Sequence, residues 1–392
     1  MKKQPETSAA GIGIIGCGKR VRGLARLLQE CRGQAIRTAA VVDPSDESIR
    51  LAREALNPEL RVCRTVEELV QSPDIEWVIV GSPNAAHREH VVAAFRAGKH
   101  VFCEKPLAIS LEDCLEMRDA QKASGRKFFF GLCLRYSPFY RKIMDVLRNG
   151  GVGDIISLEF NETLDFNHGG YIMGNWRRLR ENAGTHLLEK CCHDIDIANW
   201  LIDSPAIRVA SFGDLNFFRP ENVRHMERLG THSSGKPAYQ VWPDPSPENP
   251  FTAEKDIVDN QVLILEYANQ VRACFHTNCN AGIPERRMYI LGTEGSIRGD
   301  AREGRVEFRR IGFDEPLQVY DTGVRGGHAG GDERMIEDFA ACILDGTPPP
   351  TGMDEGIRAA VTCFSADLAL DNGTIQDITD SWKKAGIHAS PS

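Results

Sequence analysis

The sequence lacks the features that mark membrane, secreted and nucleic-acid-binding proteins. No apolar run approaches the roughly 20 residues needed to span a bilayer, and no apolar segment precedes the first predicted strand as a secretory signal would require. The net charge is −8, so the chain has no basic excess to attract a phosphate backbone. We therefore expect no membrane and no nucleic acid among its partners, and a cytoplasmic location.

Cysteine occurs twelve times, but never in the C-x-x-C spacing of zinc knuckles and thioredoxin-like sites. Most of these cysteines lie inside apolar segments, which is typical of reduced core residues in a cytosolic protein. Histidines and carboxylates form no compact ligand motif, so we assign no metal and keep zinc or manganese as a minor alternative. The side chains considered for such a site are His168, His186, Glu189, His193, Asp196 and His328.

The first third of the chain alternates short apolar runs with helical patterns. Strands are predicted at 11–15, 36–43, 75–82, 100–105 and 127–132. Strand–helix alternation with continuous apolar strands is typical of a parallel, doubly wound α/β sheet. We therefore predict a nucleotide-binding type of domain over residues 1–132.

The remainder, residues 133–392, has a different pattern. Extended, hairpin-like runs between 206 and 312 predict an open, mostly antiparallel sheet in an α+β domain. Residues 219–256 are rich in Pro, Ser, Asn and His, and we predict a loop insertion there. An open sheet offers a face to bury, so we expect a homo-oligomer, either a dimer or a tetramer. Helices are predicted near 137–149, 185–202, 330–345 and 354–372.

Two overlapping glycine patterns lie in "GIGIIGCGKRVRG", residues 11–23. A phosphate loop must follow a strand and open a helix, whose N-terminal N–H groups then face the phosphate. Gly11 and Gly13 fall inside the predicted strand, so the literal G-x-G-x-x-G is in the wrong context. Gly16-Cys17-Gly18 lies at the strand end and is the predicted phosphate turn. Val21 takes the third fingerprint position, and we expect its bulk to displace the helix slightly.

Asp43 ends the second predicted strand, where an acid accepts hydrogen bonds from the ribose hydroxyls of adenosine. An acid here disfavours a ribose 2′-phosphate, so we predict NAD in preference to NADP. The basic neighbours Lys19, Arg20 and Arg22 keep NADP open as the less favoured cofactor. A strand-terminal Asp that caps the next helix is the alternative interpretation of Asp43.

Four further stretches carry a resemblance to a known family. They are "GSPNAAHREHVVAAFRAGKHVFCEKPLA" (81–108), "GLCLRYSP" (131–138), "NWRRLRENAGTHLLEKCCHDID" (175–196) and "ILGTEGSI" (290–297). Through these stretches the chain resembles the Gfo/Idh/MocA family of glucose–fructose oxidoreductase and inositol dehydrogenase. The resemblance covers nearly the whole chain in the same order, apart from the 219–256 insertion. The resemblance implies a Rossmann domain joined to an open-sheet domain. It also implies nicotinamide-dependent oxidation or reduction of a sugar or cyclitol hydroxyl.

The resemblance also implies which residues contact the cofactor. Besides the phosphate turn and Asp43, the family's contacts fall on the loops that follow the next two predicted strands. A Trp-Arg pair lies near the nicotinamide in family members. The implied cofactor-binding residues are Gly16, Cys17, Gly18, Lys19, Arg20, Asp43, Ser82, Pro83, Asn84, His87, Glu104, Trp176 and Arg177.

Oxidation of an alcohol requires a hydride acceptor and a base for the hydroxyl proton. Lys105 follows a predicted strand at its carboxyl end, where doubly wound sheets bind their ligands. There it is able to hydrogen-bond the reacting oxygen, and the family's catalytic lysine matches it. A solvated lysine before a proline is the alternative.

At about 100° per residue, the helix near 185–202 places a polar stripe opposite an apolar face. The family's acid–x–x–x–His pattern matches Glu189 and His193, and the i,i+4 spacing lets the carboxylate orient the imidazole. We predict His193 as general base and Glu189 as its partner. Lys190, a quarter-turn away, is also within reach of the site. An ordinary solvated helix face is the alternative, but the polar stripe contains no Lys or Arg, which argues against it. The residues of the stripe are His186, Glu189, His193, Asp196 and Trp200.

The substrate pocket is predicted from two polar loops, "DFNHGGYIMGNWRR" (165–178) and "RGGHAGGDE" (325–333). The candidate substrate residues are Arg135, Tyr136, His168, His186, Asp196 and His328. Three functions remain open on these residues. The first is an NAD-dependent dehydrogenase for a sugar, sugar derivative or cyclitol. The second is an NAD-dependent glycosidase that acts through transient oxidation and elimination, and the third is a non-catalytic NAD sensor, against which Lys105 and His193 argue.

Overall fold

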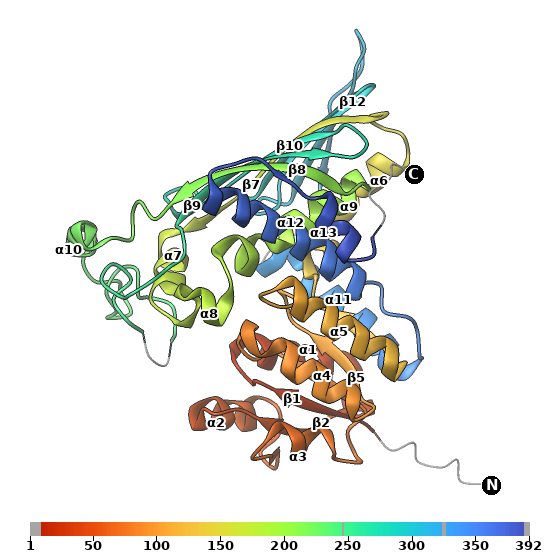
Figure 1. Cartoon of the computed structure of the whole chain (residues 1–392), viewed down its shortest axis with the longest axis vertical. Coiled ribbons are helices and arrows are strands. Elements are labelled where there is room, and N and C mark those ends of the chain that lie inside the picture. Colours follow the sequence, from red (N-terminus) through yellow and green to blue (C-terminus); the bar gives the residue numbers. More distant parts are fainter. Residues whose placement is uncertain (1–8, 245–246, 324–326, 388–392) are drawn as a thin grey trace. The chain divides into compact units, whose positions relative to one another are not determined.

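The computed structural model describes residues 9–244, 247–323 and 327–387 (Figure 1). The chain forms two compact units, each assembled from separate stretches. The N-terminal unit takes residues up to 108 together with 112–133 and 332–356. The C-terminal unit takes 109–111, 134–331 and 357 onward.

A parallel six-stranded sheet forms the centre of the N-terminal unit. Its strand order, β3-β2-β1-β4-β5-β6, is that of a dinucleotide-binding Rossmann sheet, as predicted. The strands are β1 (Ala10–Ile15), β2 (Ile36–Val42), β3 (Arg61–Val62), β4 (Trp77–Val80), β5 (His100–Cys103) and β6 (Phe128–Phe130). The helices between them are α1 (Lys19–Arg32), α2 (Asp46–Ala55), α3 (Val66–Val70), α4 (His87–Arg96) and α5 (Leu111–Ser124).

A helix from late in the sequence, α11 (Gly331–Leu344), completes this unit. Its Phe339 ring lies 5.1 Å from Trp77, 4.9 Å from Phe102 and 5.3 Å from Phe129, measured between ring centroids. Burying such aromatic area stabilises the sheet. The sequence-based division at residue 132 left this helix with the second domain. The structure instead places α11 in the N-terminal unit. The sequence does not show this, because the aromatic rings that Phe339 contacts are more than 200 residues earlier in the chain.

The C-terminal unit is built on an open nine-stranded sheet of order β14-β13-β12-β11-β7-β10-β9-β8-β15. Within this sheet, β7 and β10 form the one parallel pair among the described strands, so the predicted, mostly antiparallel sheet is confirmed. The strands are β7 (Ile155–Asp165), β8 (Ala206–Asp214), β9 (Asn260–Tyr267), β10 (Arg272–Ala281), β11 (Arg287–Gly292), β12 (Gly295–Asp300), β13 (Arg305–Arg310), β14 (Gln318–Asp321) and β15 (Gln376–Asp377).

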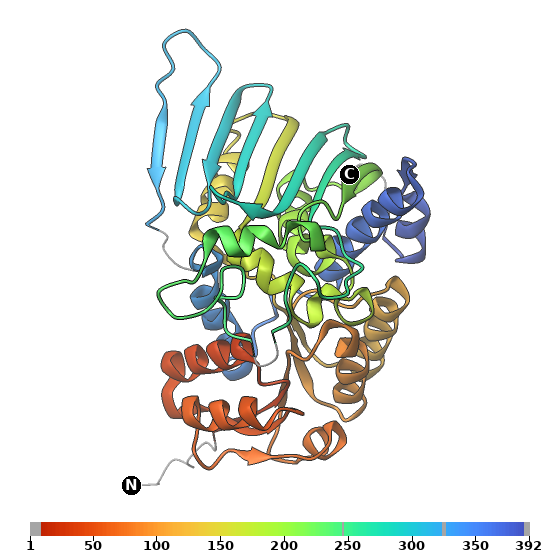
Figure 2. The ribbon, with the colours of Figure 1, turned by 90° about the vertical axis from the view of Figure 1, so that its left-hand side faces the viewer.

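Helices cover one face of this sheet, as Figures 1 and 2 show for α9 and α12. Among them α6 contacts β13, α7 contacts β10 and α9 contacts β7. Strand residues that point to the other face alternate with buried ones and remain exposed. The unit's helices are α6 (Pro138–Arg148), α7 (Phe166–Met173), α8 (Arg180–Ala183), α9 (Cys192–Ile202), α10 (Arg224–Leu229), α12 (Met353–Asn372) and α13 (Thr379–Lys384). The exposed apolar side chains of the uncovered face are Phe212, Val262, Ile264, Tyr289, Leu291 and Val319.

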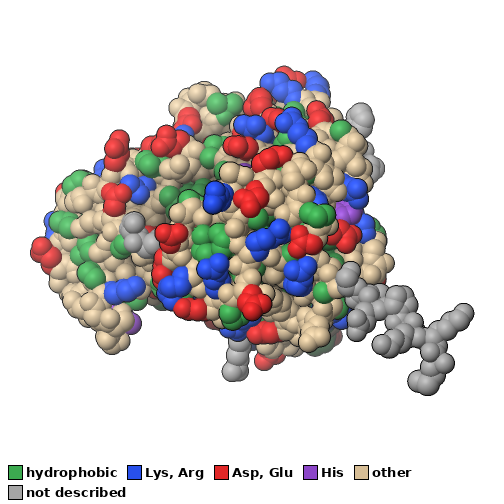
Figure 3. Space-filling model, turned by 90° about the horizontal axis from the view of Figure 1, so that it is seen from below, with side chains coloured by type: hydrophobic (Ala, Val, Ile, Leu, Met, Phe, Trp, Pro, Cys, Tyr) green, Lys and Arg blue, Asp and Glu red, His purple; other side chains and the backbone are tan. Residues whose placement is uncertain are grey.

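Two general expectations bear on the surface of the described residues. No helix among them is both long and apolar enough to cross a bilayer. In the space-filling view, acidic and basic side chains are interspersed and neither sign gathers into a large patch on the face shown (Figure 3).

Candidate active site

The cofactor turn, Gly16–Gly18, connects β1 to α1 as predicted. Gly16 has a φ of +82°, which favours glycine, and a Cβ there would lie 2.6 Å from the backbone N of Ser82. Gly18 is the N-cap of α1, and no side chain caps the helix. Backbone N–H groups at an uncapped helix N-terminus suit a phosphate, so the turn fits the pyrophosphate of a dinucleotide.

The literal G-x-G-x-x-G has a packing role. Gly11 and Gly13 both lie in β1. A Cβ at Gly11 would lie 1.8 Å from the carbonyl oxygen of Asp74, and one at Gly13 would lie 2.6 Å from Cδ2 of Leu69. The two glycines therefore let neighbouring chain approach the strand closely.

Val21, at the third fingerprint position, is buried against the end of β4. A Cβ added to Gly81 would lie 2.0 Å from Cγ2 of Val21. The glycine that is missing from the helix is therefore present in the facing loop. This exchange makes room for the valine next to the cofactor turn.

Asp43 lies just beyond β2 and its carboxylate holds the cofactor turn. One oxygen accepts a hydrogen bond from the Cys17 N–H at 2.7 Å, and the other accepts from the Ser45 N–H at 2.8 Å. The side chain that caps α2 is Ser45, which accepts from the Ser48 N–H, so the capping interpretation of Asp43 is wrong. A carboxylate has acceptor capacity beyond two hydrogen bonds, so Asp43 also fits the ribose hydroxyls.

Lys19 and Arg20 begin α1, and Arg20 forms ion pairs with two carboxylates. Lys19 is exposed. Arg20 donates to Glu104 at 3.0 Å and makes a bidentate pair with Asp332 of α11 at 2.6 and 2.8 Å. Two carboxylates surround this guanidinium, so its predicted contact with the cofactor would require an exchange of partners.

The loops after β4 and β5 are joined by a buried histidine. The two ring nitrogens of His87 lie 2.8 Å from the carbonyl oxygen of Pro106 and 3.0 Å from that of Ser82. Burial lowers the pKa of His87. The Lys105–Pro106 peptide bond is cis, and the Lys105 side chain is half-buried. Pro83 precedes the short turn that begins at Asn84, which is 4 % exposed.

The predicted catalytic helix is irregular. Leu187–Cys191 form a π-helical turn, which we call the π-turn, and the regular helix α9 begins at Cys192. The wider turn changes the angular spacing, so the assumption of 100° per residue is wrong over these residues. π-turns inside α-helices are rare and concentrate at functional sites. Both Glu189 and Lys190 belong to this one.

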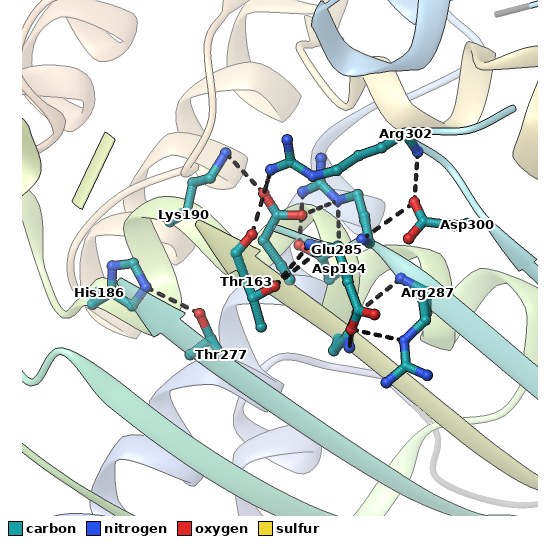
Figure 4. A network of polar contacts seen from close by, with 12 residues as sticks. Thr163, His186, Lys190, Asp194, Thr277, Glu285, Arg287, Asp300 and Arg302 are labelled. Atoms are coloured by element: carbon teal, nitrogen blue, oxygen red, sulfur yellow. Dashed lines mark hydrogen bonds and ion pairs between the residues drawn. The ribbon is translucent and has the colours of Figure 1, made fainter. Parts of the chain in front are cut away.

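Lys190 belongs to a charge network with the buried residues Glu162, Asp194 and Arg286 and with the more exposed Arg302. Figure 4 shows Lys190, Asp194 and Arg302 of this network. The Lys190 ammonium lies 3.3 Å from Glu162, whose other oxygen lies 2.8 Å from Arg286. Arg286 also makes two 2.8 Å hydrogen bonds to Asp194. Burial alone would raise the pKa of Glu162, but Arg286 and Lys190 hold that pKa below its usual value. The network ties the π-turn and α9 to β7.

Glu189, the neighbour of Lys190 in the π-turn, forms a salt bridge with Arg177. The Arg177 guanidinium donates to Glu189 at 2.9 Å and to the Tyr171 hydroxyl at 3.2 Å, and it lies 4.2 Å from the centroid of the Trp176 ring. The predicted Trp-Arg pair therefore forms a cation–π contact in the same unit as the π-turn. Arg177 fixes the position of the Glu189 carboxylate.

The predicted substrate residues separate into buried and more accessible groups. Arg135 and Asp196 make a bidentate pair at 2.8 Å, and Asp196 is only 1 % exposed. Tyr136 is also 1 % exposed. His186 lies against β10 with its Nε2 3.2 Å from the hydroxyl of Thr277, and burial lowers its pKa to about 4. His168 is half-buried on α7.

His328 lies beside His193. The two ring centroids are 5.6 Å apart. His328 and Ala329 both have positive φ, +52° and +50°, and the Ala329 carbonyl oxygen accepts a hydrogen bond from the Ser137 hydroxyl at 2.8 Å. Left-handed backbone at two successive non-glycine residues is strained and tends to occur at functional sites.

The comparisons with known proteins identify the family of the chain. The family described as "Oxidoreductase family, NAD-binding Rossmann fold" matches residues 10–132, and its "C-terminal alpha/beta domain" matches residues 145–366. The chain belongs to the Gfo/Idh/MocA oxidoreductase family. The predicted resemblance and the predicted NAD-binding domain are thereby confirmed.

Several members of the family are similar over most of the chain. Inositol 2-dehydrogenase of Ralstonia nicotianae is 31% identical over 339 residues, 81% of this chain and 86% of the relative. The 2,7-anhydro-N-acetylneuraminate hydratase of Escherichia coli is 27% identical over 311 residues, 79% of this chain and 73% of the relative. A levoglucosan dehydrogenase in complex with NADH and levoglucosan has a TM-score of 0.77 at 18% identity, over 94% of this chain and 99% of that one.

Sequence reasoning missed several residues of this Gfo/Idh/MocA protein. Asp332, which binds Arg20, lies in the "GGDE" stretch of the predicted polar loop 325–333. Glu162 and Arg286 were not singled out. The signal for Glu162 was an acid inside the strand-like run "LEFNETLDF", where a charge requires a buried partner. Nothing in the sequence marks Arg286 as that partner.

Proposed function

We propose that the protein transfers a hydride between NAD and a secondary hydroxyl of a sugar, sugar derivative or cyclitol. The observation that carries the proposal is the set of buried titratable side chains around the π-turn, where Glu189 is fixed by Arg177 and His193 lies beside His328. Such clusters of buried ionisable groups are typical of catalytic sites. Relatives that are named for inositol and levoglucosan support the substrate class.

In this proposal each catalytic residue has one role. Bound NAD supplies the hydride acceptor. Lys105 donates a hydrogen bond to the reacting oxygen, and His193 accepts the proton of the reacting hydroxyl group. Glu189 stabilises the protonated imidazole, and Arg177 fixes the carboxylate. For Lys190 we propose a positioning role, because its ammonium lies 3.3 Å from Glu162.

Among the predicted substrate residues, His168 and His328 are the candidates we retain for direct contact. Arg135 and Asp196 neutralise one another, so we do not propose Arg135 as a binding group for a carboxylated sugar. Tyr136 and His186 are each 1 % exposed and support the site from behind.

A second candidate is a reaction in which transient oxidation by NAD assists cleavage or hydration of an anhydro bond or glycoside. The similarity to the 2,7-anhydro-N-acetylneuraminate hydratase favours keeping it. Both candidates use the same cofactor turn and the same base. They differ in the product, because only the first leaves NADH in solution.

A screen for product formation tests the proposal. The full chain is incubated with NAD and a panel of inositols, hexoses, anhydrosugars and methyl glycosides, and NADH, released methanol and sugar formed by opening of the anhydrosugars are measured. NADH in proportion to substrate consumed supports the dehydrogenase. Methanol or opened anhydrosugar without net NADH favours the second candidate, and none of these products from any compound contradicts both.

We also propose that the uncovered sheet face is buried between two copies of the chain, as a dimer or within a tetramer. Exposed apolar side chains lie on the neighbouring strands β8 and β9 of this face, at Phe212 and Ile264, and again on β11, at Tyr289. Light scattering of the wild type should give a multiple of the chain mass. Ile264→Lys should reduce the mass to one chain, whereas Ile283→Lys, in the exposed turn after β10, should not. A wild type of single-chain mass contradicts the interface.

For the compartment, we propose the cytoplasm. All twelve cysteines are free thiols, and most are buried. Burial raises the pKa of the Cys17 thiol to about 12, and the charge of Asp43 adds to the effect, so this thiol stays protonated beside the cofactor turn. A thiol retained next to a cofactor is typical of a reducing compartment. Localisation of a fluorescent fusion tests the assignment.

A further inference from the structure

The 219–256 insertion shares an aromatic core with Phe217 and Phe218, which precede it, and this core packs on α7. Phe217, Phe218, Tyr239 and Phe251 contact one another with ring centroids 5.1 to 5.9 Å apart. All but Phe217 are buried, in one cluster with α7 residues Ile172 and Met173. The segment predicted as a loop is therefore a packed part of the C-terminal unit.

Two glycines of α7 allow this close packing on opposite sides. A Cβ at Gly169 would lie 1.7 Å from the carbonyl oxygen of Cys279 in β10, and one at Gly170 would lie 2.1 Å from that of Tyr239 in the insertion. Neither position has room for a side chain. The helix is thus held between the sheet and the insertion.

Both ends of the segment 239–248 are fastened to α7 and the turn that follows it. The Tyr239 N–H donates to the side-chain oxygen of Asn167, and the Glu248 N–H donates to the Gly174 carbonyl, each at 2.9 Å. Gln240 closes the segment by donating to the Glu248 carbonyl at 2.9 Å. Trp242 follows two residues after Gln240, so these hydrogen bonds hold the chain close to it.

The segment carries Trp242, an indole that remains 39% exposed. Its ring stacks on His168 with centroids 4.2 Å apart and an interplanar angle of 20°, and it lies 5.5 Å from the Tyr171 ring. Burial lowers the pKa of His168 well below its usual value, and the charge of Lys190 acts in the same direction. A neutral imidazole is therefore stacked on one face of the indole.

This aromatic stack adjoins the proposed catalytic groups within the same unit. Tyr171 accepts a hydrogen bond from Arg177, which in turn holds Glu189. Glu189 and Lys190 are also among the charges that act on His168. An exposed aromatic ring, fixed by packing, thus lies beside polar groups that suit hydroxyls.

We propose that Trp242 is a stacking platform for the C–H face of a sugar or cyclitol ring, which makes the insertion part of the substrate site. The negative face of an indole attracts the polarised C–H groups that a pyranose or cyclohexane ring presents on one side. Open-chain polyols have no such flat face, so the platform selects rings. The substrate class rests on the proposed function, whereas the platform itself is a statement about binding.

Binding without turnover tests the platform directly. The full chain is saturated with NADH, so that no ring hydroxyl is oxidised, and titrated calorimetrically with myo-inositol, 1,6-anhydroglucose, methyl glucopyranoside and open-chain glucitol. Trp242→Phe keeps a π face, whereas Trp242→Leu keeps apolar bulk without one. We expect the dissociation constant of the bound ring compound to rise about tenfold in W242L and less than about threefold in W242F. Phe313→Ala, at an exposed aromatic residue after β13, is the control and should match the wild type.

The outcomes separate the platform from the proposed function. Equal ring affinity in W242L and wild type overturns the platform, as does tighter binding of glucitol than of every ring, or no binding of any ring. Equal losses in W242F and W242L also overturn it, because they indicate that Trp242 only packs on His168. Oxidation of these compounds by NAD is measured separately with the wild type. A failure there contradicts the proposed function while the NADH titrations still decide the platform.

Discussion

The cofactor turn of the N-terminal unit and the π-turn of the C-terminal unit are held by different kinds of interaction. The cofactor turn depends on hydrogen bonds from the Gly16 N–H to the Val42 carbonyl and from the Cys17 N–H to the Asp43 carboxylate. It also depends on the absence of side chains at Gly16 and Gly81. The π-turn depends on buried charges, with Lys190 bound to Glu162 and Asp194 bound to Arg286. The first arrangement gives close approach to a ligand backbone. The second fixes side chains whose charges act at a distance, and it costs desolvation of each ion.

The difference suggests how each region should fail. A turn built from missing side chains is blocked by an added methyl group, with little change elsewhere. A buried charge network fails as a unit, because a charge that loses its partner remains in a low-dielectric interior. The following changes test this contrast, in order of decreasing expected effect.

His193→Ala should lower kcat by about 10²- to 10⁴-fold, because it removes the proposed general base. The dissociation constant for NAD should be nearly unchanged, since the cofactor turn lies in the other unit. Steady-state kinetics and NAD titration measure the two quantities. His232→Ala, at an exposed histidine of the insertion, is the matched control. Undiminished turnover in H193A would exclude the assigned role.

Arg286→Met should lower the free energy of unfolding by about 3–5 kcal/mol, because Glu162 and Asp194 lose their shared partner inside the unit. Urea denaturation measures the change. The adjacent Arg287→Met removes an exposed pair with Glu285 and should cost less than about 1 kcal/mol. Similar losses in the two variants would show that the network contributes little.

Asp367 predicts a pH dependence of stability. Its carboxyl accepts hydrogen bonds from Thr185, just before the π-turn, and from Gln261, but burial raises its pKa from 3.8 to about 7. The folded state therefore holds a proton that the unfolded state releases, so this contribution to stability is present below about pH 4 and is lost as pH rises towards 7. Asp367→Asn should remove the part of this loss that falls between pH 5 and pH 7.5, about 2.5 kcal/mol, from the difference between unfolding measured at those two pH values. Parallel curves for variant and wild type would refute the shift.

Gly81→Ala should weaken NAD binding about tenfold and destabilise by about 1–3 kcal/mol, because the added methyl meets Val21 at 2.0 Å. Adding Val21→Gly should restore NAD binding, since the double variant has the usual glycine in the helix. Stability should stay low, because the buried valine is lost. Titration with NAD and thermal unfolding follow the two effects. A double variant as weak as G81A would show that the pair does not exchange space.

The parallel sheet and the cofactor turn were predictable because their signals are local. The strand ends, Gly16–Gly18 and Asp43 all follow from patterns within the first 43 residues, and only the role of Gly81 required the structure. The open sheet followed in the same way from alternation along each strand. The position of α11 was not predictable, because Phe339 packs on strands far away in sequence.

The candidate site was predicted in its residue types more than in its contacts. Glu189, Lys190 and His193 were identified, but the π-turn was not, because it depends on Glu162 and Arg286 in other strands and loops. Trp242 was missed because an isolated Trp in a polar, proline-rich segment carries no periodic signal. The Trp242 ring stacks on His168 of α7. Gly169 and Gly170 allow the close packing around this helix, and the sequence alone does not reveal that role.

The most direct test of hydride transfer uses a ring substrate from the screen that is deuterated at the carbinol carbon. The account predicts that the wild type moves this deuterium to NAD, so that mass spectrometry finds one deuterium in each reduced cofactor, and that H193A slows the transfer. Consumption of the substrate with no deuterium in the nicotinamide, bound or free, would contradict the account.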